Sequence, residues 1–308
     1  MARRRPKASG GWRRNRRWRR PPELSRRAIA NPSGRPPNPY LTGRPAACPS
    51  PAKRWRGRRG VGYWLVTGGS SGIGLQLVRD LLGDGHEVLV WDIREPPAID
   101  GLGFDAVDLA KPEEIAAAAT RIGRKVDCFV HCAGVFQATS VLHDNLVQTS
   151  ELAFRLHCLA FVAAVQALLP KFPEAGAAIV AITSAGMDMA YPGTLAYGPS
   201  KAALKRAIEQ LAVELGGRGI RVNGVSPGAI ATDMTRHMWD DPDFRRERVK
   251  HIPLGRQSDP GSVSDAVRFL CSDRAAYISG ETLWVDGGVR RGMFQAGVRD
   301  TMNAGERA

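Results

Sequence analysis

The stretch that most constrains the fold of this chain is LVTGGSSGIG, from Leu65 to Gly74. An apolar run ends at Thr67, four glycines fall within the next seven residues, and a leucine- and valine-rich segment then runs to Leu82. This order predicts a buried strand, a tight turn and a helix. Glycine permits turn angles that a Cβ forbids, and the free N–H groups at a helix start favour an anion such as a phosphate. The spacing is GxxxGxG rather than GxGxxG, so this stretch alone leaves a dinucleotide site and a plain tight turn equally open.

The next expected strand, EVLVWD at residues 87–92, ends in an acid. Asp92 lies about 20 residues after the glycines, where a carboxylate hydrogen-bonds a ribose 2′-hydroxyl in dinucleotide-binding folds. The same carboxylate would repel a 2′-phosphate, so NAD is favoured over NADP. Arg94 weakens this preference, whereas Ser71 offers a phosphate no positive charge. The alternative for Asp92 is a solvated residue at a strand end.

Strand and helix patterns alternate through the rest of the body. Further strands are expected at residues 103–109, 126–131, 177–183, 220–225 and 282–285, and helices at 111–122, 147–169, 195–215 and 260–271. Residues 93–102 are too short and too rich in Pro and Gly for a full helix, and a loop is expected before residue 260. The pattern predicts an α/β fold: a single-domain doubly wound parallel sheet, Rossmann-type, with three layers in the order α/β/α. We expect this domain to span residues 61–290, followed by a tail at 291–308.

Charge divides the chain into two parts. Residues 1–60, the leader, hold nineteen of the 44 Lys and Arg residues and one acidic residue, Glu23, which leaves 25 basic and 29 acidic residues in the body. The leader therefore carries a net charge of +18 and the body −4, so the pI near 10.2 reflects the leader. A segment rich in Arg, Pro and Gly with scattered Trp cannot bury enough apolar surface to offset chain entropy, and we expect it to be disordered.

Three interpretations of the leader stay open. Arginine with interleaved tryptophan suits non-specific nucleic-acid binding. An Arg-rich, acid-poor N-terminus is also typical of an organelle transit peptide, although its prolines break any long amphipathic helix, and it lacks the apolar region of a secretory signal. The third interpretation is a mis-called start, with the working protein beginning near Val61, directly before the first strand.

Cysteine spacing and hydropathy bear on other kinds of site. The five cysteines, at positions 48, 128, 132, 158 and 271, form no CxxC pair and no zinc-ligand spacing, so no metal is expected. Cys128, Cys132 and Cys158 lie in apolar runs typical of core residues, which suits a reducing, cytoplasmic location. No apolar run approaches the length of a membrane span, so no membrane partner is expected.

A Tyr and a Lys one helical turn apart are the candidate catalytic groups. Tyr197 and Lys201 lie at i, i+4 near the start of an expected helix and share a face, and Ser184 precedes Tyr197 by thirteen residues at a strand end. An ammonium near a phenol stabilises the phenolate, so the phenol pKa falls toward working pH. The phenol then acts as general acid or base at an alcohol or carbonyl oxygen. YxxxK alone is usually a solvated helix face, but here it follows a dinucleotide fingerprint.

With these motifs in place, the region from about 62 to 288 resembles the short-chain dehydrogenase/reductase family. The matching pieces are TGGSSGIG at 67–74, Asp92, Asp108-Leu109, Ala133-Gly134, Ser184, Tyr197 with Lys201, Asn223, Pro227-Gly228 with Thr232, and VDGG at 285–288. The combination is specific even though each piece is not.

The resemblance implies a role for each matching residue. Tyr197 would be the general acid/base, Lys201 would bind the nicotinamide ribose and lower the Tyr pKa, and Ser184 would hydrogen-bond the reacting oxygen. The implied cofactor-binding residues are Gly68, Ser70, Ser71, Gly72, Ile73, Gly74, Asp92, Asp108, Leu109, Ala133, Gly134, Tyr197, Lys201, Pro227, Gly228, Ile230 and Thr232. The resemblance also implies a homodimer or homotetramer assembled through the helices at 147–169 and 195–215.

Two histidines depart from the family pattern. The family usually has Asn where this chain has His131, and a catalytic Asn at the position of His157, thirteen residues before the proline that closes the long helix. The family's Asn holds a water that passes protons to the lysine, which makes His157 a fourth candidate catalytic residue. A His is larger, however, and titrates near pH 6.5. The alternative for both positions is a buried, hydrogen-bonded His that transfers no proton.

These residues predict an NAD-dependent oxidoreductase acting on CH–OH groups (EC 1.1.1.-), which interconverts a small secondary alcohol and the ketone. The substrate pocket is expected to be largely apolar and aromatic, with contributions from Phe136, His143, Met187, Met189, Tyr191, Met234, Met238 and Trp239. Residues 226–239 are similar to those of bacterial dehydrogenases of cyclic dihydrodiols, so a cyclic alcohol is one candidate substrate. Two alternatives remain: a non-enzymatic dinucleotide-binding sensor or scaffold, and an NADP-dependent ketone reductase.

Overall fold

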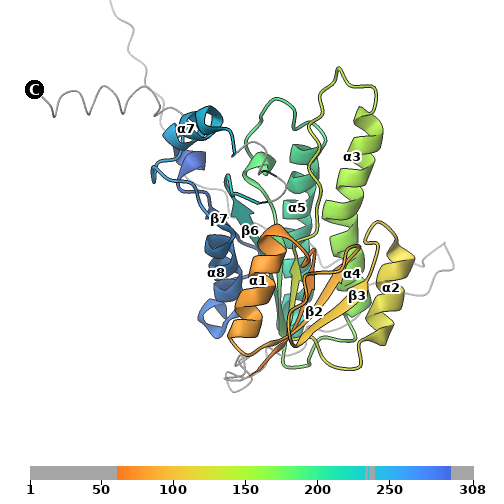
Figure 1. Ribbon diagram of the computed structural model, residues 1–308. Coiled ribbons are helices and arrows are strands. Elements are labelled where there is room, and N and C mark those ends of the chain that lie inside the picture. The colour runs from red at the N-terminus through yellow and green to blue at the C-terminus, as the bar shows by residue number, and fades with distance from the viewer. Residues whose placement is uncertain (1–60, 233–234, 236–239, 293–308) are drawn as a thin grey trace, which may run out of the picture. The chain divides into compact units, whose positions relative to one another are not determined.

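A computed structural model describes residues 61–292 except for 233–234 and 236–239. Its centre is one seven-stranded sheet in which every pair of neighbouring strands is parallel (Figure 1). The strands are β1 (Tyr63–Thr67), β2 (Glu87–Asp92), β3 (Leu102–Ala106), β4 (Cys128–His131), β5 (Ala177–Ile182), β6 (Ile220–Pro227) and β7 (Thr282–Val285). Their order is β3-β2-β1-β4-β5-β6-β7. The predicted doubly wound parallel sheet is confirmed.

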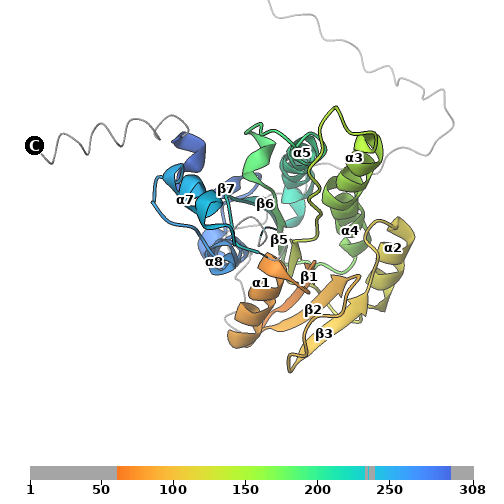
Figure 2. The ribbon, with the colours of Figure 1, turned by 45° about the horizontal axis from the view of Figure 1, so that its top comes forward.

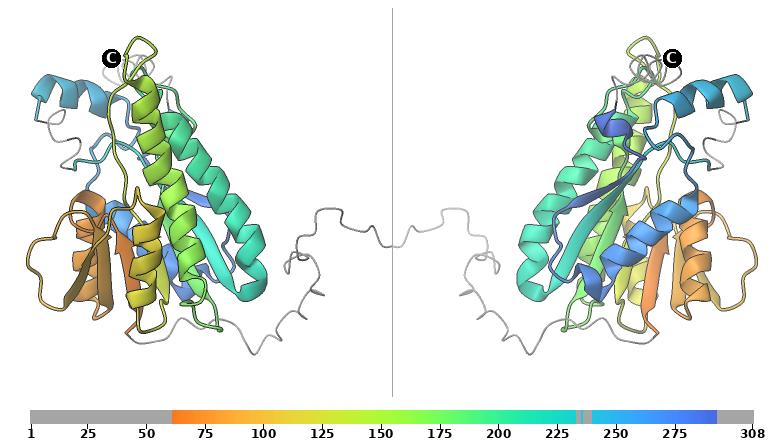
Figure 3. Two further views of the ribbon diagram at one scale, coloured as in Figure 1. Left: turned by 90° about the vertical axis from the view of Figure 1, so that its right-hand side faces the viewer. Right: turned by 90° about the vertical axis from the view of Figure 1, so that its left-hand side faces the viewer.

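Helices cover both faces of the sheet, as the two views of Figure 3 show. One face carries α1 (Gly72–Gly83) and α8 (Pro260–Cys271), and the other carries α2 (Pro112–Arg121), α4 (Ala160–Leu168) and α5 (Tyr197–Leu215). Because all six residues of β5 are buried, the central strands read as unbroken apolar runs rather than as alternating patterns. Each face therefore has its own hydrophobic cluster.

The strand order reverses between β1 and β4, which pair with each other in parallel. Figure 2 shows β1 followed by β2 and β3 toward one edge of the sheet. β1 leads through a turn into α1 on one face, and β4 leads toward α3 (Leu146–Phe154) on the other. In open α/β sheets the carboxyl ends of the strands at such a point leave a crevice where ligands bind. The topology therefore places the glycine turn after β1 and residues 132–136 after β4 at one ligand-binding edge.

Some local predictions differ from the structure. The long helix expected at 147–169 is helical from Leu146 to Leu168, but the segment Arg155–Leu159 between α3 and α4 is a π-helix. A further helix, α7 (Pro242–Lys250), occupies part of the region expected to be a loop, because Asp241 caps it and Pro242 begins it. Short 3-10 turns lie at Ala185–Met187, Gly216–Arg218, Asp273–Ala275 and Val289–Arg291. No helix forms at 93–102, as expected.

The expectation that no apolar run approaches the length of a membrane span is corrected by the helical run Leu146–Leu168. Its 23 residues have a mean hydropathy of 1.4 over the most apolar window, which satisfies the length and composition of a span. Helices that pack against a sheet inside a folded domain satisfy the same criterion, and α4 contributes Phe161, Val165 and Leu168 to the core. The leader at 1–60, most of the tail at 291–308 and the predicted pocket residues Met234, Met238 and Trp239 lie outside the described residues.

Candidate active site

A cavity of about 790 Å³ opens at the carboxyl ends of β1, β2, β4, β5 and β6. The cavity collects the three predicted catalytic residues Ser184, Tyr197 and Lys201 together with His157. All but one of the predicted cofactor-binding residues also line it: Gly68, Ser71, Gly72, Ile73, Gly74, Asp92, Asp108, Leu109, Ala133, Gly134, Tyr197, Lys201, Pro227, Gly228, Ile230 and Thr232. The exception is Ser70. Motifs spread over more than 160 residues of sequence therefore meet in one site.

The glycine turn fits a phosphate-bearing cofactor by its backbone shape. Gly68 has a φ of +68°, and a Cβ there would lie 2.6 Å from the backbone N of Ala133. At Gly74 a Cβ would lie 2.1 Å from the carbonyl oxygen of Gly68, so only glycine lets α1 approach the turn this closely. The N-cap residue of α1, Ser71, makes no side-chain capping bond. The first N–H groups of α1 are thus available to a pyrophosphate.

Asp92 is held at the cavity wall by its neighbours. Its carboxylate accepts hydrogen bonds from the backbone N–H groups of Ser70 and Arg94, both at 3.2 Å. The Ser70 hydroxyl in turn donates to the carbonyl oxygen of Arg94 at 2.5 Å. Ser70 therefore does not face the cavity but positions the acid that does. Asp92 and Arg94 both line this end, which is where a cofactor ribose would lie.

The catalytic candidates converge as the sequence predicted. Tyr197 begins α5, and Lys201 one turn later donates from Nζ to the carbonyl oxygen of Ile182 at 2.8 Å. Ser184 follows β5, and its hydroxyl accepts a hydrogen bond from Gly186 N at 3.1 Å and contacts the Tyr197 phenol. Phe136 meets the Tyr197 ring edge to face, with ring centroids 5.2 Å apart. The phenol is thus fixed between Ser184 and apolar walls.

The electrostatics of Tyr197 differ from the prediction. Burial raises the pKa of the phenol, and the hydrogen bond from Ser184 is the contact that lowers it. Lys201, which the sequence predicted would lower the Tyr197 pKa, has its own pKa lowered to about 8 by burial. Its ammonium bonds the Ile182 carbonyl and lies 5.8 Å from the centre of the phenol ring. In this structure Ser184, rather than Lys201, favours the phenolate.

His157 is fully buried beside these groups and both of its ring nitrogens are bonded. Its Nε2 accepts the backbone N–H of Val135 at 3.0 Å, so the ring proton is on Nδ1 and is donated to the Ser200 hydroxyl at 2.8 Å. Ser200 passes its own proton to the carbonyl oxygen of Tyr197 at 2.7 Å. A Cβ at Gly134 would lie 2.9 Å from Nε2, so glycine there makes room for the ring. Burial, with Lys201 nearby, lowers the pKa of His157 to about 2.

His131, at the end of β4, is the second departure from the family pattern. Its Nε2 donates to the carbonyl oxygen of Leu156 at 3.1 Å, and its Nδ1 accepts from the Thr67 hydroxyl at 2.8 Å. Burial lowers its pKa to about 3. The ring joins the strand end to the π-helical segment and does not line the cavity.

The substrate end of the cavity agrees with the prediction only in part. Phe136 and Tyr191 line it, whereas His143, Met187 and Met189 do not. His143 is exposed and accepts a hydrogen bond from Ser140 N, and the two methionines are buried. Sequence reasoning missed the α7 residues Phe244 and Arg248 as well as Leu152, Leu156 and Val289. The capping pair Asp241-Pro242 was the signal that could have located α7.

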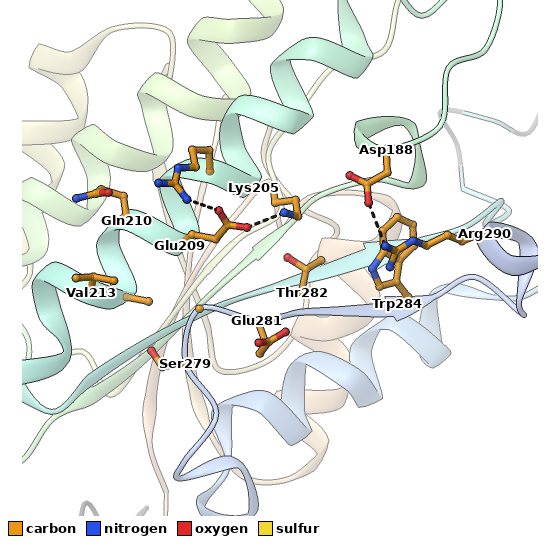
Figure 4. Close-up of a pocket in the computed structure, with 13 residues that line it drawn as sticks. Asp188, Lys205, Glu209, Gln210, Val213, Ser279, Glu281, Thr282, Trp284 and Arg290 are labelled. Atoms are coloured by element: carbon orange, nitrogen blue, oxygen red, sulfur yellow. Dashed lines mark hydrogen bonds and ion pairs between the residues drawn. The ribbon is translucent and has the colours of Figure 1, made fainter. Parts of the chain in front are cut away.

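A second cavity, of about 600 Å³, lies between α5 and β7 (Figure 4). Five of its six charged side chains pair with one another: Lys205 and Arg206 with Glu209, and Arg290 with Asp188. None of the predicted catalytic residues lines it. The first cavity is therefore the candidate active site.

The chain is similar in sequence and in structure to known dehydrogenases and reductases. The family model described as Enoyl-(Acyl carrier protein) reductase matches residues 68–290. L-rhamnose 1-dehydrogenase (NAD(P)(+)) of Azotobacter vinelandii is 31% identical over 243 residues, which cover 73% of this chain and 95% of that protein. The 7alpha-hydroxysteroid dehydrogenase of Escherichia coli K12 is 30% identical over 239 residues, covering 73% and 92%. A short chain dehydrogenase family protein from Francisella tularensis has a solved structure with a TM-score of 0.70 and 28% identity, covering 75% and 99%.

Proposed function

Because the chain belongs to the short-chain dehydrogenase/reductase family, and its relatives include an L-rhamnose 1-dehydrogenase (NAD(P)(+)) and a 7alpha-hydroxysteroid dehydrogenase, we propose that it interconverts a secondary alcohol and its ketone using NAD. The observation that carries the proposal is the convergence of Ser184, Tyr197 and Lys201 on one cavity with the glycine turn. The bound nicotinamide would supply or accept the hydride. The residues of the chain bind the cofactor, orient the reacting oxygen and transfer the proton.

Tyr197 accepts or donates the proton at the reacting oxygen. In alcohol oxidation the phenolate takes the hydroxyl proton as hydride leaves the carbinol carbon, and in ketone reduction the phenol returns it. Because burial raises the Tyr197 pKa, the protonated phenol predominates at neutral pH, which suits the reduction. Ser184 donates its hydroxyl proton to the reacting oxygen and so orients it toward Tyr197.

Lys201 and His157 position this machinery. The Lys201 ammonium is anchored on the Ile182 carbonyl at the cavity wall, where it can bond a ribose hydroxyl of the cofactor. His157 fixes the turn that follows β4 through Val135, because its two nitrogens are occupied by Val135 and Ser200. We infer that His157 holds the geometry and leaves proton transfer to Tyr197.

The preference for NAD is supported by Asp92. Its carboxylate lies at the cavity wall, held by two backbone N–H groups, where it suits a ribose 2′-hydroxyl and repels a 2′-phosphate. Arg94 also lines the cavity, and this observation favours the second candidate, an NADP-dependent ketone reductase. The ratio of kcat/KM for NAD and NADP on one substrate separates the two.

A homo-oligomer in the cytoplasm is the assembly and location that we propose. Apolar side chains are exposed along the outer face of the helical layer, among them Val147 and Leu159 on the long helical run and Val213 on α5. Burial of this face against a second copy would remove apolar surface from water. Light scattering on the purified chain tests the proposed assembly, and a monomer at micromolar concentration would refute it.

The test of the activity is an optical assay of NADH formation with cyclic and linear secondary alcohols, and of NADH consumption with ketones. Turnover by the parent and its loss in Tyr197→Phe would support the proposal. A parental rate in Tyr197→Phe would refute the mechanism, and binding of NAD without turnover of any alcohol or ketone would refute the function.

A further inference from the structure

One arginine of α7 lies at the substrate end of the cavity. Arg248 lines the cavity and is half-buried, and its guanidinium carbon lies 5.5 Å from the centre of the Tyr191 ring. Tyr191 belongs to the loop that joins Ser184 to Tyr197, so Arg248 lies beside the segment that carries the reacting groups. Its location is that of a substrate contact.

Arg248 has no carboxylate partner among the residues that the structure describes, unlike Arg246 and Lys250 on the same helix. Arg246 pairs with Asp243 at 2.5 Å, and Lys250 pairs with Glu247 at 2.6 Å. A partly buried cation without a counter-charge is costly, because desolvation is not offset by attraction to an anion. Contact with Tyr191 holds the guanidinium by a cation–π interaction and leaves most of its N–H donors for a ligand.

The surroundings of Arg248 fit a substrate that is anionic at one end and apolar elsewhere. Outside the cofactor and catalytic motifs the cavity lining is mainly apolar or aromatic, with Phe136, Leu152, Leu156, Phe244 and Val289 beside the hydroxyls of Thr194 and Thr235. The charged groups that remain in the cavity are Lys201 beside Tyr197, and Asp92, Arg94 and Asp108 at the other end. The fork of guanidinium donors matches the two oxygens of a carboxylate.

Resting on the alcohol–ketone activity proposed above, we propose that the substrate is an apolar hydroxy acid whose carboxylate is bound by Arg248. The hydroxyl proton goes to Tyr197 and the carbinol hydride to NAD, which leaves the keto acid, NADH and one proton. The carboxylate does not react. It fixes the distance between the anchor on α7 and the carbinol carbon.

The test compares hydroxy acids with their neutral methyl esters on the full chain, using linear and cyclohexyl 3-hydroxy acids with NAD and with NADP. We expect a higher kcat/KM for acids than for their esters. Arg248→Gln should lower kcat/KM for the acids by about 10- to 100-fold, since a hydrogen bond to a charged group is lost, and should lower it far less for the esters. Arg245→Gln is the matched control, because Arg245 is exposed on the same helix and does not line the cavity.

Calorimetric titration of the chain with the corresponding acids that lack the hydroxyl separates this proposal from the activity. Saturable binding that is lost in Arg248→Gln, with NADH affinity unchanged, supports the carboxylate site even if no alcohol is oxidised, in which case the proposed activity fails alone. The proposal is overturned if esters are oxidised as well as acids, if Arg248→Gln weakens acids and esters alike, or if none of the acids binds.

Discussion

Lowering the pH from 7.5 to 5.0 is a direct test of the two buried histidines. His131 and His157 are both fully buried, and each uses both ring nitrogens in hydrogen bonds to groups of the chain. Burial, followed by the charge of Lys201, lowers their pKa values to about 3 and about 2. In the folded chain both rings therefore stay neutral over the whole interval.

The size of the effect follows from the difference in proton binding between the two states. An unfolded histidine has a pKa near 6.5, so below that pH the unfolded chain binds two protons that the folded chain excludes. The contribution of the two neutral rings to the free energy of unfolding is thus fully present above pH 6.5, and it is lost as the pH falls toward about 3. At pH 5.0 each histidine lowers the free energy of unfolding by about 2 kcal/mol, and the pair by about 4 kcal/mol. That is a large part of the ~5–15 kcal/mol typical of a domain.

Urea unfolding followed by circular dichroism at pH 7.5, 6.5, 5.5 and 5.0 measures this loss. The double variant His131→Asn/His157→Asn cannot titrate at these positions, so its free energy of unfolding should fall by about 4 kcal/mol less than that of the parent between pH 7.5 and 5.0. The control His143→Asn changes an exposed histidine and should keep the parental pH dependence. If the free energy of unfolding fell equally in the parent and the double variant, the buried rings would already accept protons in the folded state.

Three further changes address the chemistry and the cofactor turn. Tyr197→Phe should lower kcat by about 10²- to 10⁴-fold, because the acid/base group is lost, with NADH binding by fluorescence unchanged. Gly74→Ala places a Cβ 2.1 Å from the Gly68 carbonyl oxygen and should lower stability by ~1–3 kcal/mol and weaken NADH binding. In the control Gly83→Ala on the same helix, the added Cβ meets no atom within 4 Å, so stability and NADH binding should stay as in the parent. Equal melting temperatures for the two variants would contradict the packing argument. Asp92→Ser removes the charge that repels a 2′-phosphate, so use of NADP relative to NAD should rise roughly tenfold, and an unchanged ratio would assign the preference elsewhere.

The fold could be predicted because its signals are local. Buried parallel strands are continuous apolar runs, and glycine and proline mark where they end. The bounds of β2, α8 and β7 match the prediction residue for residue. The site motifs were equally readable, since an acid at the end of β2 and the YxxxK pair each depend on a short stretch of sequence.

What the sequence did not reveal depends on contacts between distant segments. Ser70 lies within the glycine fingerprint, yet it faces Asp92 and Arg94 rather than the cavity, because the turn after β1 packs against the end of β2. Arg248 enters the cavity only because α7 crosses the substrate end, and its helix is too polar to show an apolar face. The pKa of Tyr197 likewise depends on how deeply the fold buries the phenol, which spacing does not report.

The two histidines are best understood as one arrangement with the π-helical segment Arg155–Leu159. His131 donates to the carbonyl oxygen of Leu156 in that segment, and His157, the next residue of the segment, accepts the N–H of Val135 just after β4. The two rings therefore bond in opposite directions between the β4 end and the π-helical segment. The ring proton is on Nε2 in His131 and on Nδ1 in His157. If His157 took a proton on Nε2, it would lose its bond to Val135 and place a second charge beside Lys201. A proton relay through this imidazole would thus disrupt the turn that holds the cofactor, and for that reason we assign His157 to positioning.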